Sequence, residues 1–165
     1  MNHIIAKMSD GDWKQVCSIY LEGIATGHAT FEAQSPTWMQ WNASHLPDCR
    51  FIARSGERIK GWAALSPASN RCVYEGVAEV SVYVGQNYRG EGVGRALLQA
   101  LIAASEQSGV WTLQAGVFPE NDASIRLHKT CGFREVGRRE RIGRMNGVWR
   151  DTDLLERRSK IVGVD

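Results

Sequence analysis

The chain has 165 residues, 43% of them hydrophobic and 23% charged, which fits a single globular domain spanning residues 1–165. Its formal net charge of +2 gives no indication of a nucleic-acid partner. The four cysteines form no Cys-x-x-Cys pair and have no histidine at zinc spacing, so we expect free thiols and no metal site. No stretch has the length of a membrane span or the apolar run of a signal peptide, which makes the cytoplasm the expected location and predicts no membrane contact.

The first part of the chain predicts a strand, two helices and a hairpin. The predicted elements are, in chain order, a strand at 4–8, a helix to about residue 25, a helix that opens at Ser35 and Pro36 and closes at Pro47 and Asp48, and strands at 50–54 and 59–65. Both helices have apolar residues at helical spacing behind a capping residue, and a Ser-Gly-Glu-Arg turn joins the two strands. A polar and aromatic loop, residues 27–32, lies between the helices.

A strand, a glycine-rich turn and a helix are predicted to follow one another in the centre of the chain. Valines alternate with other residues and predict a strand over 76–84, and apolar residues then recur at helical spacing to about residue 108. Between the two, Gly90, Gly92 and Gly94 leave backbone N–H groups bare at a helix N-terminus. The unpaired donors and the helix dipole make this an anion site, most naturally for phosphate.

The spacing of these glycines excludes two familiar phosphate-binding loops. A Walker loop needs a Gly-Lys-Ser/Thr string that the chain lacks, and a dinucleotide fingerprint would need a third glycine where Arg95 or Leu97 stands. The alternative of an ordinary strand-to-helix connection would avoid the backbone entropy that three alternate glycines cost. The remaining pattern, Arg89-x-x-Gly92-x-Gly94 after a strand with an acidic residue, resembles the pyrophosphate loop of the GNAT superfamily of N-acetyltransferases, which bind acetyl-CoA.

The last part of the chain predicts a strand, a short helix and a closing hairpin. Residues 111–117 predict the strand, and Asn121–Ser124 is expected to cap the helix. Strands at 133–142 and 148–155 flank Asn146-Gly147, a strong hairpin signal. The resulting order of elements resembles that of the GNAT fold, which implies an α/β protein with a mixed, mostly antiparallel sheet, splayed at the central strands, and flanking helices.

Further motifs are spread over the whole chain. They are Ile19-Tyr20, Thr30-Phe31-Glu32, Pro36-Thr37, Arg71-x-x-Tyr74, Glu79-x-Ser-Val-Tyr-Val84, Asn121-x-x-Ser124-Ile-x-Leu-His128, Gly132-Phe133 and Gly147-x-Trp149-x-Asp151. Together they resemble phosphinothricin acetyltransferases and relatives that act on methionine sulfoximine or methionine sulfone, which acetylate the α-amino group of a small amino-acid analogue. The sequence departs from this pattern at Ser69-Asn70 and at Val77, near the expected substrate side, and this leaves the identity of the substrate open.

Acetyl transfer from a thioester to an amine requires that the amine lose a proton, that the carbonyl oxygen be stabilised and that the thiolate leave. Glu79, on the strand before the glycine loop, is the first candidate for the general base, acting directly or through water, and Glu32 is the second. A solvated charge and a loop salt bridge are their structural alternatives. His128 stands where many family members place a tyrosine that protonates the thiolate, and it can equally be a packing residue.

The resemblance places acetyl-CoA on the central strand, the glycine loop and the helix that follows the next strand. Backbone N–H groups of the strand would polarise the acetyl carbonyl, and the loop would hold the pyrophosphate. The asparagine, which is a good helix N-cap in any case, would also contact the cofactor. The residues implied are Val82, Tyr83, Val84, Arg89, Gly90, Glu91, Gly92, Val93, Gly94, Arg95, Asn121 and Ser124.

The resemblance also assigns residues to the acceptor. Arg71 with Tyr74 would bind the substrate carboxylate, and Phe31 would wall the pocket. Trp149 and Asp151 resemble residues that family dimers place near the neighbouring active site, so a homodimer is expected, although a core tryptophan is the simpler interpretation without the family.

Two other functions stay open from the sequence. The first is an acetyltransferase for another amine, such as a polyamine, an aminoglycoside or a peptide N-terminus; a cationic acceptor would favour an acidic pocket, whereas Arg71 favours an anionic amino acid. The second is a non-catalytic acetyl-CoA-binding module. The presence of Glu79, Glu32 and Arg71 argues against this second function.

Overall fold

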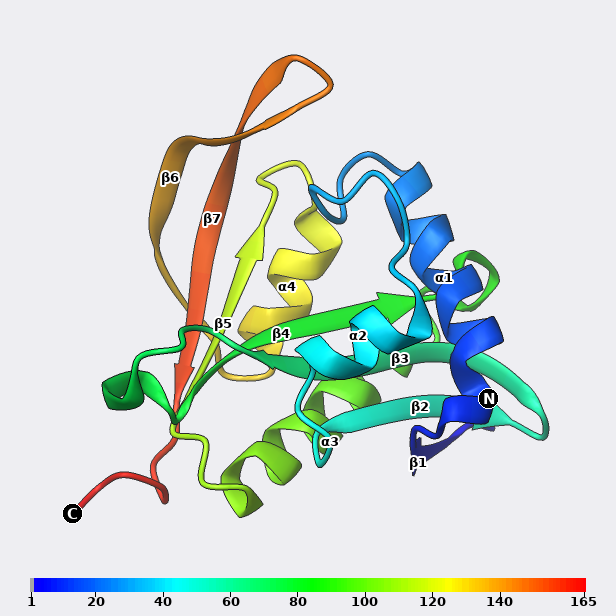
Figure 1. The fold of residues 1–165 in the computed structure, drawn as a ribbon, viewed down its shortest axis with the longest axis horizontal. Coiled ribbons are helices and arrows are strands. Elements are labelled where there is room, and N and C mark those ends of the chain that lie inside the picture. The colour runs from blue at the N-terminus through cyan, green and yellow to red at the C-terminus, as the bar shows by residue number, and fades with distance from the viewer. Residues whose placement is uncertain (1) are drawn as a thin grey trace.

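The computed structural model describes residues 2–165, which form a seven-stranded sheet with helices on both faces (Figure 1). The elements are β1 (Ile4–Lys7), α1 (Trp13–Ala25), α2 (Trp38–Ser44), β2 (Arg50–Ser55), β3 (Arg58–Pro67), β4 (Val77–Val84), α3 (Val93–Gln107), β5 (Thr112–Val117), α4 (Asp122–Thr130), β6 (Arg134–Met145) and β7 (Val148–Arg158). Short 3-10 turns lie at Asp10–Asp12, Cys72–Tyr74 and Gln86–Tyr88. The order of elements predicted from the sequence is confirmed.

The strands lie in the order β1-β2-β3-β4-β5-β7-β6, and β4 with β5 is the parallel pair in a sheet whose other pairs are antiparallel. β3 stays paired with β4 from Pro67 opposite Ala78 to Gly61 opposite Val84. β5 pairs with β4 only over Val77–Glu79. Beyond Glu79 the two halves of the sheet therefore diverge, and the predicted splayed sheet is confirmed.

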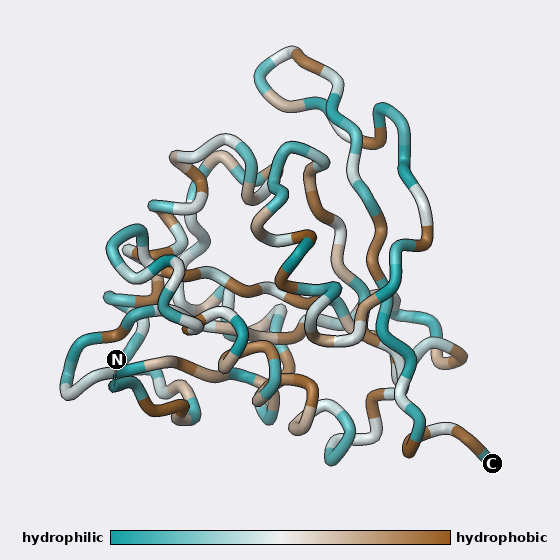
Figure 2. The backbone as a smooth tube through the Cα atoms, turned by 180° about the vertical axis from the view of Figure 1, so that it is seen from behind, coloured by the Kyte–Doolittle hydropathy of each residue, from teal (hydrophilic) through white to brown (hydrophobic). Residues whose placement is uncertain are grey.

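Each face of the sheet carries its own apolar core. On one face α3 packs on β2, β3 and β4, and leucines such as Leu97 and Leu101 are fully buried. On the other face α1 packs on β3 and β4 around Trp41 and Trp62. Burial of such side chains contributes about 1.5–3 kcal/mol each, relative to exposure in water. Figure 2 shows hydrophobic stretches along the central strands, in agreement with a core on each face of the sheet.

Strand β4 serves both cores because successive side chains of a strand point to opposite faces. Val80, Val82 and Val84 belong to the core on the α3 side, and Tyr83 packs in the core on the α1 side. The predicted alternation of this strand is confirmed.

The start of the second helix differs from the prediction. Thr37, not Ser35, is the N-cap, because its hydroxyl accepts a hydrogen bond from the Gln40 N–H at 3.3 Å. The Gln40 side chain in turn accepts from the Thr37 N–H at 2.9 Å, and this reciprocal capping box fixes the helix start. Pro36 consequently precedes the cap and does not belong to the first turn.

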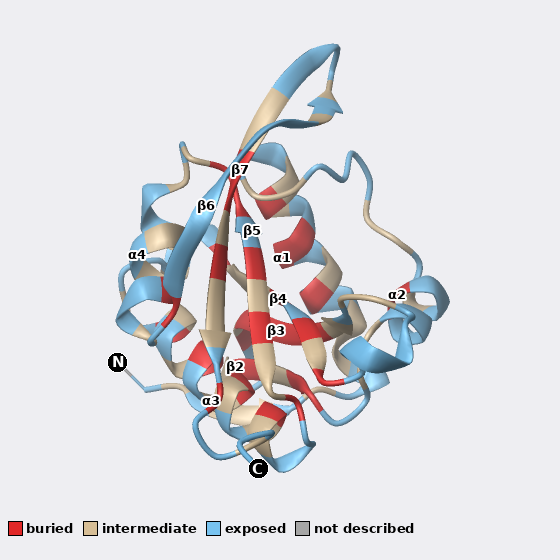
Figure 3. Ribbon diagram, turned by 90° about the vertical axis from the view of Figure 1, so that its left-hand side faces the viewer, coloured by how far each residue is buried: buried red, intermediate tan, exposed pale blue. Residues whose placement is uncertain are grey.

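The β6–β7 hairpin projects beyond the rest of the molecule as a two-stranded arm (Figure 1). Its turn places Asn146 at φ 50° and Gly147 at φ 79°, as the predicted Asn-Gly turn requires. Arg139 lies opposite Thr152 and Gly143 opposite Arg150, so residues 140–142 bulge out of the pairing. Figure 3 shows β6 exposed over most of its length, whereas β5 and the middle of β7 consist mainly of buried and intermediate residues.

Candidate functional site

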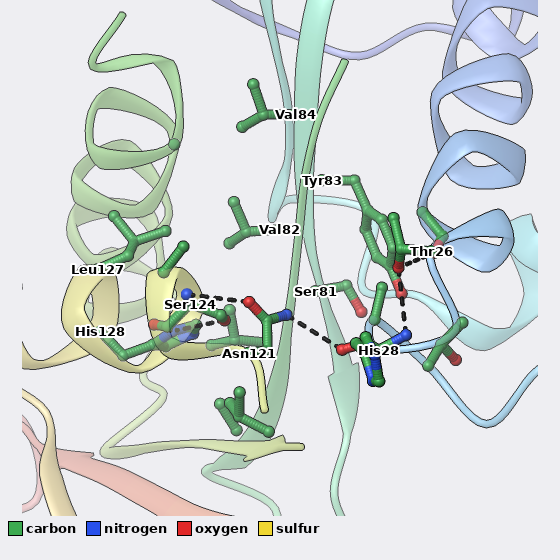
Figure 4. Close-up of a pocket in the computed structure, with 18 of the residues that line it drawn as sticks. Thr26, His28, Ser81, Val82, Tyr83, Val84, Asn121, Ser124, Leu127 and His128 are labelled. Carbon is green, nitrogen blue, oxygen red and sulfur yellow. Dashed lines mark hydrogen bonds between the residues drawn. The ribbon is translucent and has the colours of Figure 1, made fainter. Parts of the chain in front are cut away.

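A pocket of about 800 Å³ occupies the space where β4 and β5 diverge. β4 forms one wall, and β5 with the N-terminal part of α4 forms the other (Figure 4). The glycine loop before α3 closes one end, and the loop after α1 covers the other. One continuous pocket thus joins the predicted anion site to the predicted catalytic carboxylates.

The glycine loop leaves the start of α3 uncapped. Gly92 is the N-cap residue at φ 80°, a left-handed conformation that glycine adopts at little cost, and no side chain caps the helix. A Cβ atom at Gly90 or Gly92 would meet no atom within 4 Å, so the backbone there is open to a ligand. Arg89 and Arg95 line the pocket beside it. These features fit a pyrophosphate, because N–H donors, the helix dipole and two cations converge there.

Two other loop residues have different surroundings. Val93 lines the pocket and is buried under the first turn of α3. The Glu91 carboxylate accepts from Lys60 Nζ at 3.1 Å and is absent from the pocket lining of the described residues. Glu91 therefore ties the loop to β3.

The wall formed by β4 exposes both its backbone and its side chains. Val82 and Val84 point toward α3 and α4, whereas Ser81 and Tyr83 point toward α1 (Figure 4). Beyond Glu79 the edge of β4 that faces β5 has no registered strand partner. Backbone N–H groups on that edge thus have no strand partner among the described residues, and their contact with an acetyl carbonyl stays a prediction.

Three carboxylates line the end of the pocket that the loop after α1 covers: Glu32, Glu79 and Glu120. Glu79 is exposed and is the last residue of β4 that pairs with β5, opposite Gln114. Neither Glu79 nor Glu32 forms an ion pair within residues 2–165. The salt-bridge alternative for Glu32 therefore has no partner within these residues, and both carboxylates stay candidates for the general base.

Two tyrosines pack behind this end of the pocket. The rings of Tyr20 and Tyr83 lie 5.0 Å apart, centroid to centroid. Burial, followed by the proximity of Tyr20, raises the pKa of Tyr83 above its usual value, so its hydroxyl stays protonated and can donate a hydrogen bond. A Cβ atom at Gly23 would lie 2.7 Å from the Tyr83 ring, and the glycine is required for this packing.

The imidazole of His128 is buried in the wall of the pocket. Its Nδ1 lies 2.7 Å from the Ser124 carbonyl oxygen, and because a carbonyl can only accept, Nδ1 carries the proton. Burial lowers the pKa of His128, and the neutral ring therefore presents an unprotonated Nε2, which has no partner in the described structure. In this state Nε2 is a hydrogen-bond acceptor and cannot protonate a thiolate, which argues against the general-acid role.

Asn121 caps α4 and also reaches across the pocket. Its Oδ1 accepts from the Ser124 N–H at 3.2 Å, as the sequence predicted for a cap. Its Nδ2 donates to the His28 carbonyl oxygen at 3.1 Å, on the opposite wall (Figure 4). Asn121 and Ser124 both line the pocket, and one N–H of the Asn121 amide remains for a ligand.

Four residues expected at the acceptor lie outside the pocket. Arg71 and Tyr74 are exposed in and beside the Cys72–Tyr74 turn, with the Arg71 guanidinium 5.4 Å from the Tyr74 ring centre. Trp149 is exposed on the hairpin arm, and Asp151 accepts from the backbone N–H of the bulge at Arg141, at 2.8 Å. Within one chain these side chains do not contribute to the pocket wall.

Phe31 does line the pocket, with its ring edge-on to Phe118 at 4.8 Å. Several further lining residues received no role from the sequence: Tyr20, Thr26, His28, Thr30, Ser81, Tyr88, Phe118, Glu120, Leu127 and Thr152. Tyr20 and Thr30 belong to motifs that carried the family resemblance, and those motifs were the available signal. For Phe118, Glu120 and Thr152 no local pattern existed, because tertiary packing alone brings them to the pocket.

The forked sheet with an uncapped helix N-terminus at the fork defines the class of protein. The model of the acetyltransferase (GNAT) family matches residues 13–133, and the chain belongs to this family. The family predicted from the motifs is thereby confirmed, as is an N-acetyltransferase fold. Of the helices in residues 2–165, none combines the length and apolar character needed to cross a membrane.

Within this family the chain is similar to several proteins of known name. Over 155 residues the chain is 35% identical to a phosphinothricin N-acetyltransferase from Alcaligenes faecalis, covering 90% of this chain and 78% of that protein. It is 37% identical over 83 residues to an L-methionine sulfoximine/L-methionine sulfone acetyltransferase from Pseudomonas aeruginosa, covering 50% of this chain and 48% of that one. The crystal structure of a phosphinothricin acetyltransferase from Sinorhizobium meliloti in complex with acetyl-CoA has a TM-score of 0.87 and 26% identity, covering 100% of this chain and 92% of that chain.

Proposed function

We propose that this protein is a cytoplasmic N-acetyltransferase that transfers the acetyl group of acetyl-CoA to the α-amino group of a small amino-acid analogue, of the phosphinothricin, methionine sulfoximine or methionine sulfone type. The observation that carries the proposal is the continuous pocket between an anion site at the start of α3 and the free carboxylates Glu79 and Glu32. The relatives named above support the choice of acceptor.

Bound acetyl-CoA supplies the thioester, and the residues of the chain hold and polarise it. The N–H groups around Gly92 and the cations of Arg89 and Arg95 hold the pyrophosphate, which fits the uncapped helix start. The bare edge of β4 at Val82–Val84 donates N–H hydrogen bonds to the thioester carbonyl oxygen and stabilises the negative charge that develops there.

Glu79 is the general base of the proposed mechanism. It accepts the proton of the acceptor ammonium, directly or through water, and the amine nitrogen then forms a bond to the acetyl carbon. The C=O bond opens to an oxyanion as the C–N bond forms. When the carbonyl re-forms, the C–S bond breaks and the thiolate leaves, and the extra proton on the newly bonded nitrogen passes to water. A thiol with a pKa of about 8.5 is a tolerable leaving group without an acid, so the neutral His128 need not donate a proton. Glu32 is the second candidate for the base.

Recognition of an amino-acid carboxylate requires a cation. Among the described residues, Arg89 and Arg95 are the arginines that line the pocket, no lysine does, and both belong to the glycine-loop end. We assign the carboxylate to Arg71 with Tyr74 on the resemblance to phosphinothricin acetyltransferases, although both residues lie outside the pocket of a single chain. In a homodimer, Trp149 and Asp151 on the hairpin arm would complete the acceptor site of the other copy.

A cationic acceptor is the second candidate, because the carboxylates Glu32 and Glu79, unpaired within the described residues, line the pocket, whereas Glu120 is paired with Arg150. Such an acceptor would be a polyamine, an aminoglycoside or a peptide N-terminus. A non-catalytic acetyl-CoA-binding module is a third, weaker candidate, since binding alone would not require the carboxylates Glu79 and Glu32 in the pocket.

The deciding experiment is thiol release from acetyl-CoA with a panel of amines: phosphinothricin, methionine sulfoximine, methionine sulfone, spermidine, an aminoglycoside and a short peptide. Turnover confined to the three amino-acid analogues supports the proposal. Turnover confined to the cationic acceptors or the peptide would show that the proposed acceptor class is wrong, while the acetyl-transfer reaction would stand. Binding of acetyl-CoA without turnover of any amine overturns catalysis and favours the binding module.

A further inference from the structure

The loop that follows α1, residues 26–32, covers the acceptor end of the pocket. It contributes Thr26, His28, Ala29, Thr30, Phe31 and Glu32 to the pocket lining. Near α1 it is held at Thr26, whose hydroxyl donates to the Gly23 carbonyl oxygen at 2.7 Å and accepts from the His28 N–H at 3.2 Å. It contains no helix or strand beyond that point, so its position depends on contacts made by its side chains and carbonyl groups.

Arg150 reaches this loop from β7, which lies in the other half of the forked sheet. Its Nη1 donates to the Gly27 carbonyl oxygen at 3.0 Å, and its Nη2 lies 3.0 Å from His28 Nδ1 and 3.4 Å from the Glu120 carboxylate. The guanidinium carbon lies 4.1 Å from the centre of the Phe118 ring, and the side chain is 12% exposed. A planar guanidinium with several fixed donors is suited to holding two loop groups and a carboxylate at once.

On the α1 side, Thr30 of the loop contacts the side chains of Tyr20 and Tyr83. Further contacts to the loop come from the same half of the sheet as Arg150. Asn121 Nδ2 donates to the His28 carbonyl oxygen at 3.1 Å. Phe31 packs edge-on against Phe118 and lies against Gly143 of β6, where a Cβ atom would be 2.6 Å from the Phe31 ring. A loop that begins on one wall of the pocket is therefore anchored on the opposite wall.

We propose that Arg150 is a positioning residue, which holds the loop 26–32 across the acceptor end of the pocket and thereby fixes Phe31 and Glu32 against the acceptor. The inference rests on the proposed acetyltransferase function. Arg150 itself does not line the pocket of the described residues, so its effect on the acceptor passes through the loop. Acetyl-CoA binding, at the far end of the pocket, does not depend on it.

The test compares Arg150→Met and Arg150→Lys with the wild type. Methionine keeps an apolar stem over Phe118 and loses every donor, whereas lysine keeps the charge without the fork. The matched control is Arg139→Met, which removes an exposed arginine from the same hairpin, opposite Thr152. Amide hydrogen exchange of peptides covering 26–32 reports the anchoring, and the KM for phosphinothricin and for spermidine, with kcat and the Kd for acetyl-CoA, reports the consequence.

We expect Arg150→Met to raise hydrogen exchange in the loop and the acceptor KM about tenfold, with the Kd for acetyl-CoA within about twofold of wild type, since charged hydrogen bonds to two loop groups are lost. For Arg150→Lys we expect loop exchange and acceptor KM between those of the wild type and Arg150→Met. Arg139→Met should change none of these values. A Kd for acetyl-CoA that changes as much as the acceptor KM overturns the inference, because the effect is then general.

The failure of the inference and the failure of the proposed function have different signatures. If the wild type acetylates neither acceptor, nor any other amine of the panel, the proposed function fails and the assigned consequence of anchoring fails with it. If the wild type is active but loop exchange is unchanged in the Arg150 variants, the inference fails alone. Should Arg150→Met not fold, Arg150→Lys decides between these outcomes by the same measurements.

Discussion

Replacement of Gly92 by alanine separates the role of the glycine loop in ligand binding from its role in folding. Gly92 has φ 80° and Gly109 has φ 79°, and the two residues lie just outside opposite ends of α3. A Cβ atom at either position would meet no atom within 4 Å, so the cost of alanine is purely conformational. A left-handed residue costs about 1–2 kcal/mol, and the stiffer unfolded chain returns about 0.4–1 kcal/mol. Each variant should thus lose about 1 kcal/mol of unfolding free energy, or about 2–4 °C in Tm.

Of the two variants, only Gly92→Ala should weaken the binding of acetyl-CoA, because Gly92 lines the pocket and Gly109 does not. Relief of the strain turns the N–H groups at the start of α3 away from the pyrophosphate. We therefore expect the affinity for acetyl-CoA to fall about tenfold, which corresponds to about 1.4 kcal/mol of binding free energy. Urea denaturation measures the stability, and calorimetric titration with acetyl-CoA measures the affinity. Equal affinities in Gly92→Ala and Gly109→Ala would refute the assignment of the loop as the pyrophosphate site, and a stability loss confined to one of them would refute the strain argument.

Three further changes address the reaction, the buried imidazole and the acceptor. Glu79→Gln removes the proposed base and should lower kcat about 10²–10⁴-fold with little change in the Kd for acetyl-CoA, as measured by thiol release. His128→Asn keeps a donor for the Ser124 carbonyl but cannot ionise. Because burial lowers the pKa of His128 in the folded state, wild-type stability should fall as the pH drops below about 6.5, by up to about 1.4 kcal/mol per pH unit more than in His128→Asn, as urea denaturation at several pH values will measure. Arg71→Ala should raise the KM for phosphinothricin more than that for spermidine.

Each of these three predictions has a result that contradicts it. Full activity in Glu79→Gln would transfer the role of base to Glu32. Parallel pH–stability curves for the wild type and His128→Asn would mean that His128 ionises as freely in the folded chain as in the unfolded one; His45, whose pKa burial also lowers, is present in both proteins and cancels. An unchanged KM for phosphinothricin in Arg71→Ala would place the carboxylate elsewhere, in agreement with the exposed position of Arg71.

The order of the elements was predictable because each one carries a local signal. Periodicity defines the strands and helices, and Asn121 and the Asn146-Gly147 turn act through neighbouring backbone groups. The N-cap of the second helix was predicted wrongly at Ser35. The sequence contained the correct signal, since Thr37 and Gln40 form a capping-box pattern. The divergence of β4 from β5 has no such signal, because it depends on where pairing between distant strands stops, and only the resemblance indicated it.

The candidate site divides in the same way. The position of the glycine loop at the start of α3 was predictable because the glycines and the helical pattern lie within one short stretch of chain, and the anion site there stays a prediction. The protonated nitrogen of His128 was not, since it depends on which nitrogen faces the Ser124 carbonyl. The contacts of Arg150 with Gly27 and His28 were also not predictable, because these partners lie more than a hundred residues away in the sequence.

The two ends of the pocket also differ in how they are encoded. The end assigned to acetyl-CoA is built mainly from one unbroken stretch, residues 82–95, in which strand, loop and helix start are set together. The acceptor end is assembled from separate stretches, among them residues 26–32 and 118–120, which meet only in the folded chain. Acceptor preference can therefore diverge by substitutions in any one of these stretches while the other end of the pocket is inherited whole. A single scaffold of this kind is open to a change of acceptor without a change of acyl donor.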